Sequence, residues 1–259
     1  MEKLVIFGST GAVGRLCVLH AVQDPRVEKV VAVVRSAPKP PAFFTAGAAD
    51  PAAAAALLGA KLQQVRADFG DDASLRGACD GATAGLSCVG VYTAAVKDTA
   101  DFLAREHAPN VAAARAAAAA GSVTRWGYLS GQGVAPPPPS RAAPGLLQPM
   151  FAFVKGSVER DVAAMGAFTR GVTFARPGMI LGRGDALPGL VGASERFFNG
   201  AAGSWIARTR FAVQADDIAR ALVQSVLAGT GAAARGEGRG AEVLENEDIK
   251  RRAGELGQV

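Results

Sequence analysis

Residues 3–15 read KLVIFGSTGAVGR, from Lys3 to Arg15, and this stretch decides the fold. Its first part, Lys3–Phe7, is a short apolar run of the kind that forms a strand buried in a parallel sheet. Three glycines follow at Gly8, Gly11 and Gly14. The first permits a tight turn, the second lets the backbone approach a pyrophosphate, and the third lets a helix pack closely on the strand. Between a strand and a helix, such a loop predicts a dinucleotide site.

The neighbourhood of the loop gives it this meaning, because glycines also make purely structural turns. Free amide N–H groups and the positive end of the following helix dipole would lie together here, and both attract phosphate. We therefore expect the whole loop to contact the cofactor, through Gly8, Ser9, Thr10, Gly11, Ala12, Val13, Gly14 and Arg15.

The chain downstream alternates between strand-like and helix-like segments. The further expected strands are Glu28–Arg35, Lys61–Arg66, Thr83–Gly90, Thr124–Ser130 and Val172–Arg176. One expected helix opens at Asp71 and Asp72, and an alanine-rich one covers Asn110–Ala120. The alternation predicts an α/β fold, a doubly wound parallel sheet of the Rossmann type. We expect one NAD(P)-binding domain over residues 1–259: a core over about 1–176, and a small C-terminal substrate-side lobe over about 177–259 that returns a helix (about 214–228) to the core.

The end of the second expected strand indicates which dinucleotide the site takes. A carboxylate there would hold the ribose hydroxyls of NAD, but the sequence reads Arg35-Ser36 with no acid nearby. An arginine grips a 2′-phosphate in a bidentate fork, so Arg35, assisted by Arg15 and Ser36, predicts NADP(H). The alternative is a solvated surface arginine. Asp68 and Phe69 follow the third strand and are expected to flank the adenine.

Composition excludes several classes of protein. Two histidines and three scattered cysteines in 259 residues form no metal-ligand spacing, and an odd, sparse cysteine count argues against a disulfide-stapled secreted protein. No run approaches the roughly 18–20 apolar residues of a membrane span. The net charge of +5 is spread along the chain, which fits an anionic small ligand and argues against nucleic acid.

Further motifs appear in a characteristic order after the glycine loop and Arg35. They are ADF (Ala67–Phe69), LSCVG (Leu86–Gly90), YLSG (Tyr128–Gly131), VKGSVE (Val154–Glu159) and FARPG (Phe174–Gly178). Together they resemble the atypical short-chain dehydrogenase/reductase superfamily over nearly the whole chain. Within that superfamily the chain resembles the Tat-interacting-protein-like oxidoreductases, and the branch that holds a nucleotide-binding accessory subunit of respiratory complex I and a ubiquinone-biosynthesis-associated member.

The resemblance implies NADP(H) bound across the C-terminal ends of the strands. Cys88, Val89 and Gly90 would pass under the cofactor, and the backbone at Pro177 and Gly178 would touch the nicotinamide.

The resemblance also exposes a gap in the catalytic set. Active relatives use a Ser or Thr after the fifth strand and a Tyr four residues before a Lys, because the Tyr exchanges a proton with the substrate oxygen. Lys155 stands in the expected place, but Phe151, which has no proton to give, stands four residues earlier. Lys155 is interpreted as a ribose-binding residue, with a surface lysine as the alternative. Ser130 either faces the ligand or caps the strand end.

Other residues are considered as replacement proton donors. Tyr92 follows the fourth strand, and Tyr128 shares a strand face with Ser130 by the period-two rule. Asp216 and Asp217 stand at a helix start, where N-capping is favoured over acid catalysis.

Residues Leu146–Val154 form an apolar stretch inside a run without charge. They are expected either to pack under their neighbours, or to form a pocket wall or a docking face for a protein complex. No targeting segment precedes Lys3, so the chain is expected to stay where it is made or to be a processed form. The resemblance favours a mitochondrial location, with a cytoplasmic one as the alternative.

Two functions follow from these observations. The first is a degenerate family member, a pseudoenzyme that holds NADP(H) as a structural or assembly subunit of a larger complex, for which the resemblance implies a mitochondrial respiratory one. The second is an active NADPH-dependent oxidoreductase acting on a small carbonyl or quinone-like substrate. The glycine loop and Lys155 are required by both.

Overall fold

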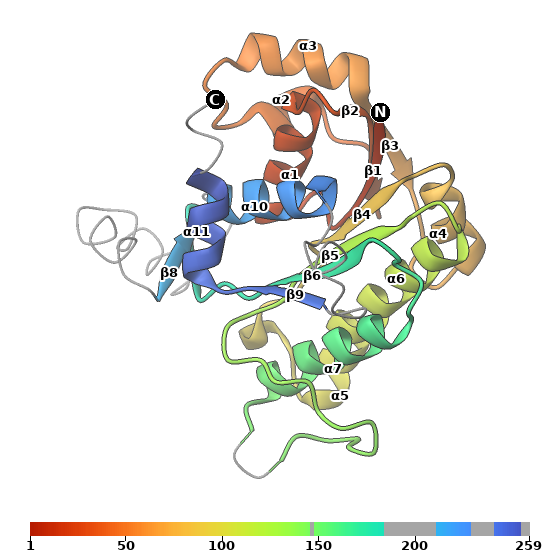
Figure 1. Ribbon diagram of the computed structural model, residues 1–259, viewed down its shortest axis with the longest axis vertical. Coiled ribbons are helices and arrows are strands. Elements are labelled where there is room, and N and C mark those ends of the chain that lie inside the picture. The colour runs from red at the N-terminus through yellow and green to blue at the C-terminus, as the bar shows by residue number, and fades with distance from the viewer. Residues whose placement is uncertain (146–147, 184–210, 229–240, 255–259) are drawn as a thin grey trace.

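The computed structural model describes residues 1–145, 148–183, 211–228 and 241–254 (Figure 1). Its centre is a seven-stranded parallel sheet with the strand order β3-β2-β1-β4-β5-β6-β9. The order reverses between β1 and β4, as in a doubly wound sheet, so the predicted fold class is confirmed. The strands are β1 (Glu2–Phe7), β2 (Val27–Val34), β3 (Leu62–Arg66), β4 (Ala84–Ser87), β5 (Arg125–Leu129), β6 (Gly171–Ala175) and β9 (Ala241–Leu244).

Helices cover both faces of the sheet (Figure 1). On one face lie α1 (Ala12–Gln23), with α2 (Pro41–Thr45) and α3 (Pro51–Lys61) packed against it, and α10 (Ala215–Ala228), with α11 (Asn246–Gly254) against it. On the other lie α4 (Asp72–Cys79), α6 (Ala108–Ala119) and α7 (Met150–Ala164). Short helical turns lead into α6: η1 (Thr93–Ala95), α5 (Thr99–Phe102) and the π-helical η2 (Leu103–His107).

Small side chains in the core explain the alanine-rich composition. Ala113, Ala114 and Ala117 of α6 are fully buried, which lets this helix lie close to the sheet. A methyl group added at Gly85 would come within 2.5 Å of the Trp126 ring. The core on this face is therefore built from a few large rings set against alanine and glycine.

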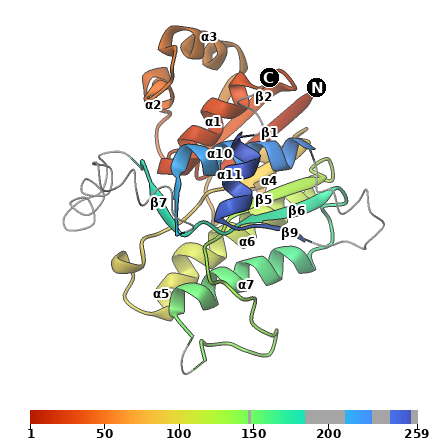
Figure 2. The ribbon, with the colours of Figure 1, turned by 60° about the vertical axis from the view of Figure 1, so that its left-hand side comes forward.

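The described C-terminal elements α10 and β9 pack on or pair with the core. The expected helix over 214–228 is α10, which packs on α1 and the sheet (Figure 2). Strand β9 is the seventh strand of the main sheet, beside β6. Of the described strands, only β7 (Met179–Leu181) and β8 (Ala212–Gln214) pair apart from that sheet. Residues 184–210, 229–240 and 255–259 of the expected lobe lie outside the described residues.

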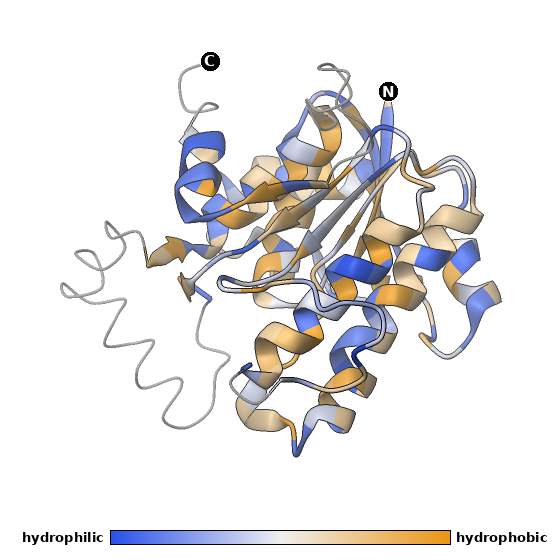
Figure 3. Ribbon diagram, turned by 60° about the horizontal axis from the view of Figure 1, so that its bottom comes forward, coloured by the Kyte–Doolittle hydropathy of each residue, from blue (hydrophilic) through white to orange (hydrophobic). Residues whose placement is uncertain are grey.

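Helix α11 is largely polar (Figure 3), and it buries only a narrow stripe around Ile249.

Local differences from the sequence expectations have simple causes. The expected strand over Thr83–Gly90 ends at Ser87, where the chain turns beneath the glycine loop. Asp216 lies inside the first turn of α10 and does not cap it, because that helix already begins at Ala215. Among the described residues, no helix is long and apolar enough to cross a membrane.

Candidate dinucleotide-binding site

The glycine loop joins β1 to α1 as a closed turn. The Gly11 amide donates to the Gly8 carbonyl at 3.0 Å, and Gly8 has a φ of +71°, which favours glycine. A methyl group at Gly8 would lie 2.5 Å from the carbonyl carbon of Cys88, and one at Gly14 would lie 2.0 Å from the Gly8 oxygen. No side chain fits at either position. The backbone conformation of the loop therefore requires glycine at both Gly8 and Gly14.

Two adjoining cavities open at the C-terminal ends of the strands, and one of them is lined by the glycine loop. The first, of about 390 Å³, contains Lys155 in its wall and is called the lysine cavity. The second, of about 560 Å³, has Arg35 in its wall and is called the arginine cavity. Gly90 and Val91 line both. The cavities therefore run from one side of the β1–β4 reversal to the other, which is where a doubly wound sheet binds its ligands.

Most of the predicted cofactor residues line these cavities. Arg35, Asp68, Phe69, Val89 and Gly90 line the arginine cavity. Gly11, Ala12, Val13, Cys88, Gly90, Ser130, Lys155, Pro177 and Gly178 line the lysine cavity.

Several predicted residues face elsewhere. The Ser9 hydroxyl is buried and donates to the Val33 carbonyl at 2.7 Å, so its side chain fastens the loop to β2. The Arg15 guanidinium donates to the Ala46 carbonyl at 3.1 Å and does not reach either cavity wall. Gly8, Thr10, Gly14 and Ser36 are not among the residues that line the cavities.

A second arginine stands beside Arg35 in the arginine cavity. Arg66 is the last residue of β3, and its register partner is Val34, so Arg35 and Arg66 leave neighbouring strands at one point. Both side chains are exposed, and in the described part of the chain neither makes an ion pair or side-chain hydrogen bond. Arg105 also lines this cavity, but it contacts Asp101 at 3.5 Å. Two guanidinium groups without a partner among the described residues thus face the space where a dinucleotide would place its adenosine end.

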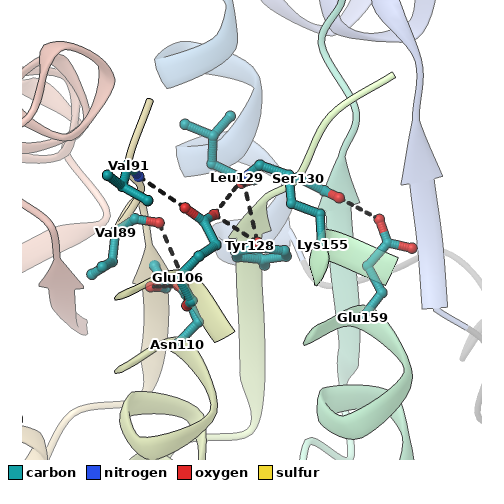
Figure 4. A network of polar contacts seen from close by, with 10 residues as sticks. Val89, Val91, Glu106, Asn110, Tyr128, Leu129, Ser130, Lys155 and Glu159 are labelled. Carbon is teal, nitrogen blue, oxygen red and sulfur yellow. Dashed lines mark hydrogen bonds and ion pairs between the residues drawn. The ribbon is translucent and has the colours of Figure 1, made fainter. Parts of the chain in front are cut away.

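A buried ion pair forms the wall of the lysine cavity (Figure 4). The Lys155 Nζ atom lies 2.5 Å from Glu106 Oε1, and the Glu106 side chain is completely buried. Nζ also lies 3.2 Å from the Leu129 carbonyl and 3.4 Å from the Tyr128 hydroxyl. An ammonium group has three protons to donate, and here three acceptors surround it.

Glu106 comes from the π-helical turn η2, and sequence reasoning missed it. Its second oxygen accepts the Val91 amide at 2.8 Å, so the carboxylate also anchors the strand-end loop between the cavities. Asn110, four residues later on the same helical face, donates to the Glu106 and Val89 carbonyls at 2.6 and 3.2 Å (Figure 4). The four-residue spacing of Glu106 and Asn110 beside an alanine-rich helix could have indicated two polar side chains on one helical face. Pro109 obscured it, because it places the expected helix start after Glu106.

The position expected for a catalytic tyrosine holds a phenyl ring packed against backbone. A methyl group on Gly131 would lie 2.3 Å from Phe151 Cζ, so the ring covers this glycine. Phe151 lines the lysine cavity, and its ring centre is 5.7 Å from the Lys155 ammonium. Phe151 therefore lies at the cavity, four residues before Lys155, and offers no hydroxyl.

Ser130 faces a buried carboxylate. Its hydroxyl donates to Glu159 Oε1 at 2.5 Å, and Glu159 forms an ion pair with Arg176. Arg176 Nε donates to the same Glu159 oxygen at 2.9 Å. This contact orients the Ser130 proton toward Glu159 and away from a ligand, although Ser130 itself borders the lysine cavity.

The two tyrosines differ sharply in exposure. Tyr128 is fully buried, and burial together with the Glu106 charge raises the pKa of its hydroxyl well above the usual value. Tyr92 is 40% exposed and lines the lysine cavity, with the Arg183 guanidinium 5.5 Å from its ring centre. Of the two, only Tyr92 can meet a ligand.

The apolar stretch Leu146–Val154 is partly outside the described residues, at 146 and 147. The rest begins α7, where Ala152, Phe153 and Val154 are buried; Phe153 and Val154 pack in one cluster with Phe102. The packed interpretation therefore holds for these three residues, while Phe151 of the same stretch forms part of a pocket wall. Among the described residues, no group of acidic, histidine and cysteine side chains could hold a metal ion.

No protein-family model and no curated protein matches this chain. Solved structures do resemble it. The Bordetella bronchiseptica enzyme WbmH, in complex with NAD+, is 19% identical, with a TM-score of 0.58 over 94% of this chain and 74% of that one. A short-chain dehydrogenase/reductase from Serratia marcescens is 15% identical, with a TM-score of 0.56 over 96% of this chain and 98% of that one. MoeE5, in complex with UDP-glucose and NAD, is 17% identical, with a TM-score of 0.60 over 99% of this chain and 82% of that one.

The chain shares their fold. The likeness extends over nearly all of its length, so it includes α10, β9 and α11. This likeness shows the shared fold, and it does not assign the chain to the atypical branch that the sequence motifs resemble.

Proposed function

We propose that this chain binds NADP(H) across the two cavities and has lost the hydride chemistry of its structural relatives. The observation that carries the proposal is the occupation of the catalytic positions. Phe151 replaces the proton donor, Lys155 is held by Glu106, and the Ser130 proton is held by Glu159. Each group that the chemistry would need is absent or already bonded within the protein.

Binding itself is supported by the glycine loop and the cavities. The loop brings backbone N–H groups to the start of α1, where the helix dipole favours the pyrophosphate. Gly90 and Val91, which line both cavities, would lie under the middle of the bound dinucleotide. WbmH and MoeE5, both solved in complex with NAD, share this fold, and that supports a nicotinamide dinucleotide as the ligand class.

The preference for the 2′-phosphate rests on charge. No carboxylate follows β2, whereas Arg35 and Arg66 both face the arginine cavity. A 2′-phosphate would pair with these guanidinium groups through charge-assisted hydrogen bonds. NADH lacks this group and would leave both arginines without a partner.

A bound nicotinamide dinucleotide supplies hydride transfer in an active enzyme, but this chain's residues supply orientation alone. Pro177 and Gly178 shape the end of the lysine cavity, and the Gly178 amide is fixed by the Asn246 side chain at 2.9 Å. Glu106 neutralises the Lys155 charge beside the site. The dinucleotide would then serve as a fixed part of the structure, in a protein that acts through assembly.

A second candidate is an NADPH-dependent oxidoreductase that uses Tyr92 as proton donor. The observation in its favour is that Tyr92 lines the lysine cavity and is 40% exposed. A tyrosine at this place would approach the nicotinamide from the side opposite Phe151.

Direct binding and turnover measurements separate the two. The purified protein is titrated with NADPH and NADH by calorimetry, and then incubated with NADPH and a panel of small aldehydes, ketones and quinones while nicotinamide absorbance is followed. The proposal expects NADPH to bind more tightly than NADH and to remain unconsumed. Turnover that disappears in Tyr92→Phe would establish the second candidate. Failure to bind either dinucleotide would overturn both.

A further inference from the structure

Two of the three cysteines lie in contact beneath the glycine loop. Cys17 Sγ, in the second turn of α1, lies 3.8 Å from Cys88 Sγ, just after the end of β4. The residues are 71 positions apart in the sequence, and nothing in the proposed dinucleotide chemistry uses either thiol. We propose that Cys17 and Cys88 are a modification site, a pair that a small disulfide oxidant converts reversibly into a disulfide linking α1 to the end of β4.

The distance suits this reaction. A disulfide bond is about 2.05 Å long, so the two sulfur atoms must approach by about 1.8 Å in total, within reach of side-chain rotation and small backbone shifts. Cys17 is fully buried, where its thiol also lies 3.9 Å from the Ala219 carbonyl of α10. The pair is therefore already held at the separation of two touching sulfur atoms.

Access to the pair is one-sided, and this sets the order of steps. Cys88 lines the lysine cavity and is 9% exposed, so an oxidant in the cavity meets this sulfur. The contact with the Cys88 thiol, together with burial, raises the pKa of the Cys17 thiol well above its usual value, so Cys17 does not attack first. It acts as the resolving thiol.

The reaction balances with a small disulfide, RSSR, as oxidant. The Cys88 thiolate attacks one sulfur of RSSR, which forms a Cys88–S–S–R mixed disulfide and releases RS⁻. Cys17 then loses its proton, attacks the Cys88 sulfur and expels a second RS⁻. The two thiols of the protein are oxidised, RSSR is reduced to two RSH, and an added thiol reverses both steps.

The pair lies where a ligand would cover it. Cys88 is followed by Val89 and Gly90, which line the cavities, and its carbonyl group lies against Gly8. A dinucleotide on the glycine loop would therefore shield Cys88 from the oxidant. This protection rests on the proposed function, whereas formation of the disulfide does not.

Cys79 provides an internal control. It is buried in α4 on the opposite face of the sheet, and burial raises the pKa of its thiol to about 12. The sequence contains only three cysteines, so none is left to pair with Cys79 once Cys17 and Cys88 are joined. The same oxidant should leave Cys79 as a thiol.

The test treats the folded, reduced protein with hydroxyethyl disulfide and reads the products by intact mass and peptide mapping. The expected result is the loss of two hydrogens, a Cys17–Cys88 cross-linked peptide, reversal by dithiothreitol, and the same product in Cys79→Ser. In Cys17→Ala the oxidant should stop at a mixed disulfide between Cys88 and 2-mercaptoethanol. A wild-type protein that gives only adducts, or remains fully reduced, overturns the proposal.

A second arm repeats the oxidation with NADPH present at about ten times its measured Kd. Cross-linking should then be slowed about tenfold, because only the unliganded fraction reacts. Unprotected cross-linking would count against dinucleotide binding at this loop and leave the cysteine pair standing. If no cross-link forms in the first arm, the cysteine proposal is overturned and dinucleotide binding is unaffected.

Discussion

Lys155 and Glu106 form a buried ion pair 2.5 Å long that joins α7 to the turn before α6. Both side chains are buried, so each charge depends on the other for the solvation it lost on folding. The pair also anchors the loop after β4 through the Val91 amide. A residue that sequence motifs assign to cofactor chemistry is here part of the internal structure.

Replacing Glu106 by Gln should cost about 3–5 kcal/mol of unfolding free energy, because Lys155 then keeps a buried charge without a counter-ion. Urea denaturation measures this loss. The matched control is Glu247→Gln, which removes an exposed pair with Lys250 and should change stability by less than about 1 kcal/mol. Equal losses in the two variants would show that the Glu106–Lys155 pair is not buried in solution.

Phe151→Tyr should fail to create NADPH-dependent carbonyl reduction. The added hydroxyl restores the proton donor, but the Lys155 ammonium that would lower its pKa is neutralised by Glu106. Steady-state assays on small aldehydes and quinones measure the result. Substantial turnover in this single variant would mean that the tyrosine alone was missing and that the ion pair does not block the chemistry.

Arg35→Ala and Arg66→Ala should each weaken NADPH binding and leave NADH binding unchanged. Each lost charge-assisted hydrogen bond is worth about 1.5–3 kcal/mol, or about 10- to 150-fold in Kd. Calorimetric titration with both dinucleotides gives the ratio. Arg115→Ala, which removes an exposed arginine of α6, is the control for net charge. A parallel loss of NADH affinity would place these arginines elsewhere than at the 2′-phosphate.

Gly14→Ala should destabilise the protein and abolish dinucleotide binding, because the new methyl group would lie 2.0 Å from the Gly8 carbonyl oxygen. Gly59→Ala is its counterpart. Gly59 lies within α3 with nothing within 4 Å of an added methyl group, and alanine should stabilise that helix by about 0.5–1 kcal/mol. Thermal unfolding with and without NADPH distinguishes the two. Normal binding by Gly14→Ala would remove the loop from the site.

Asp216 and its neighbour Asp217 should affect the pH dependence of stability in opposite directions. Hydrogen bonding to His20 lowers the pKa of Asp216 from 3.8 to about 2, so its ionised form stabilises the fold above pH 3.8, and this contribution is lost as the pH falls toward 2. Burial raises the pKa of Asp217, so stability falls as the pH rises from its unfolded value through its folded one.

Denaturant unfolding across a pH series tests the difference. Asp216→Asn should flatten the acid side of the stability profile. Asp217→Asn should raise stability at neutral pH. The same response in both variants would contradict the assignment of His20 as the partner of Asp216.

Local patterns predicted the fold and one half of the site. A few consecutive residues are enough to predict the apolar strand before Gly8, the β-branched second strand and the alanine-rich helix. The alternation of strands and helices along the chain then favours a parallel sheet. The sequence predicted Arg35, Asp68 and Phe69 because they come shortly after strands, and the ends of these strands converge on the arginine cavity.

The contacts that decide the chemistry arise between distant segments, so no local pattern reports them. Glu106 meets Lys155 across 49 positions, and Ser130 meets Glu159 across 29. The Ser9 hydroxyl was assigned to the cofactor because of its place in the loop, yet it faces β2. Strand β9 carries only four residues, too few to distinguish a main-sheet strand from a lobe strand before pairing is known.

The packing of α1 against α10 also bears on how the chain is made. His20 contacts Asp216 across 196 positions, and most of the chain lies between the first helix and the one that covers it. While a ribosome is still producing the intervening residues, the face of α1 that packs on α10 remains uncovered. The central strand β1 is likewise made long before its partner β4. During synthesis the glycine-loop segment therefore cannot complete its packing until α10 has been made. We expect chaperones to bind the exposed apolar face of an incomplete chain during this interval.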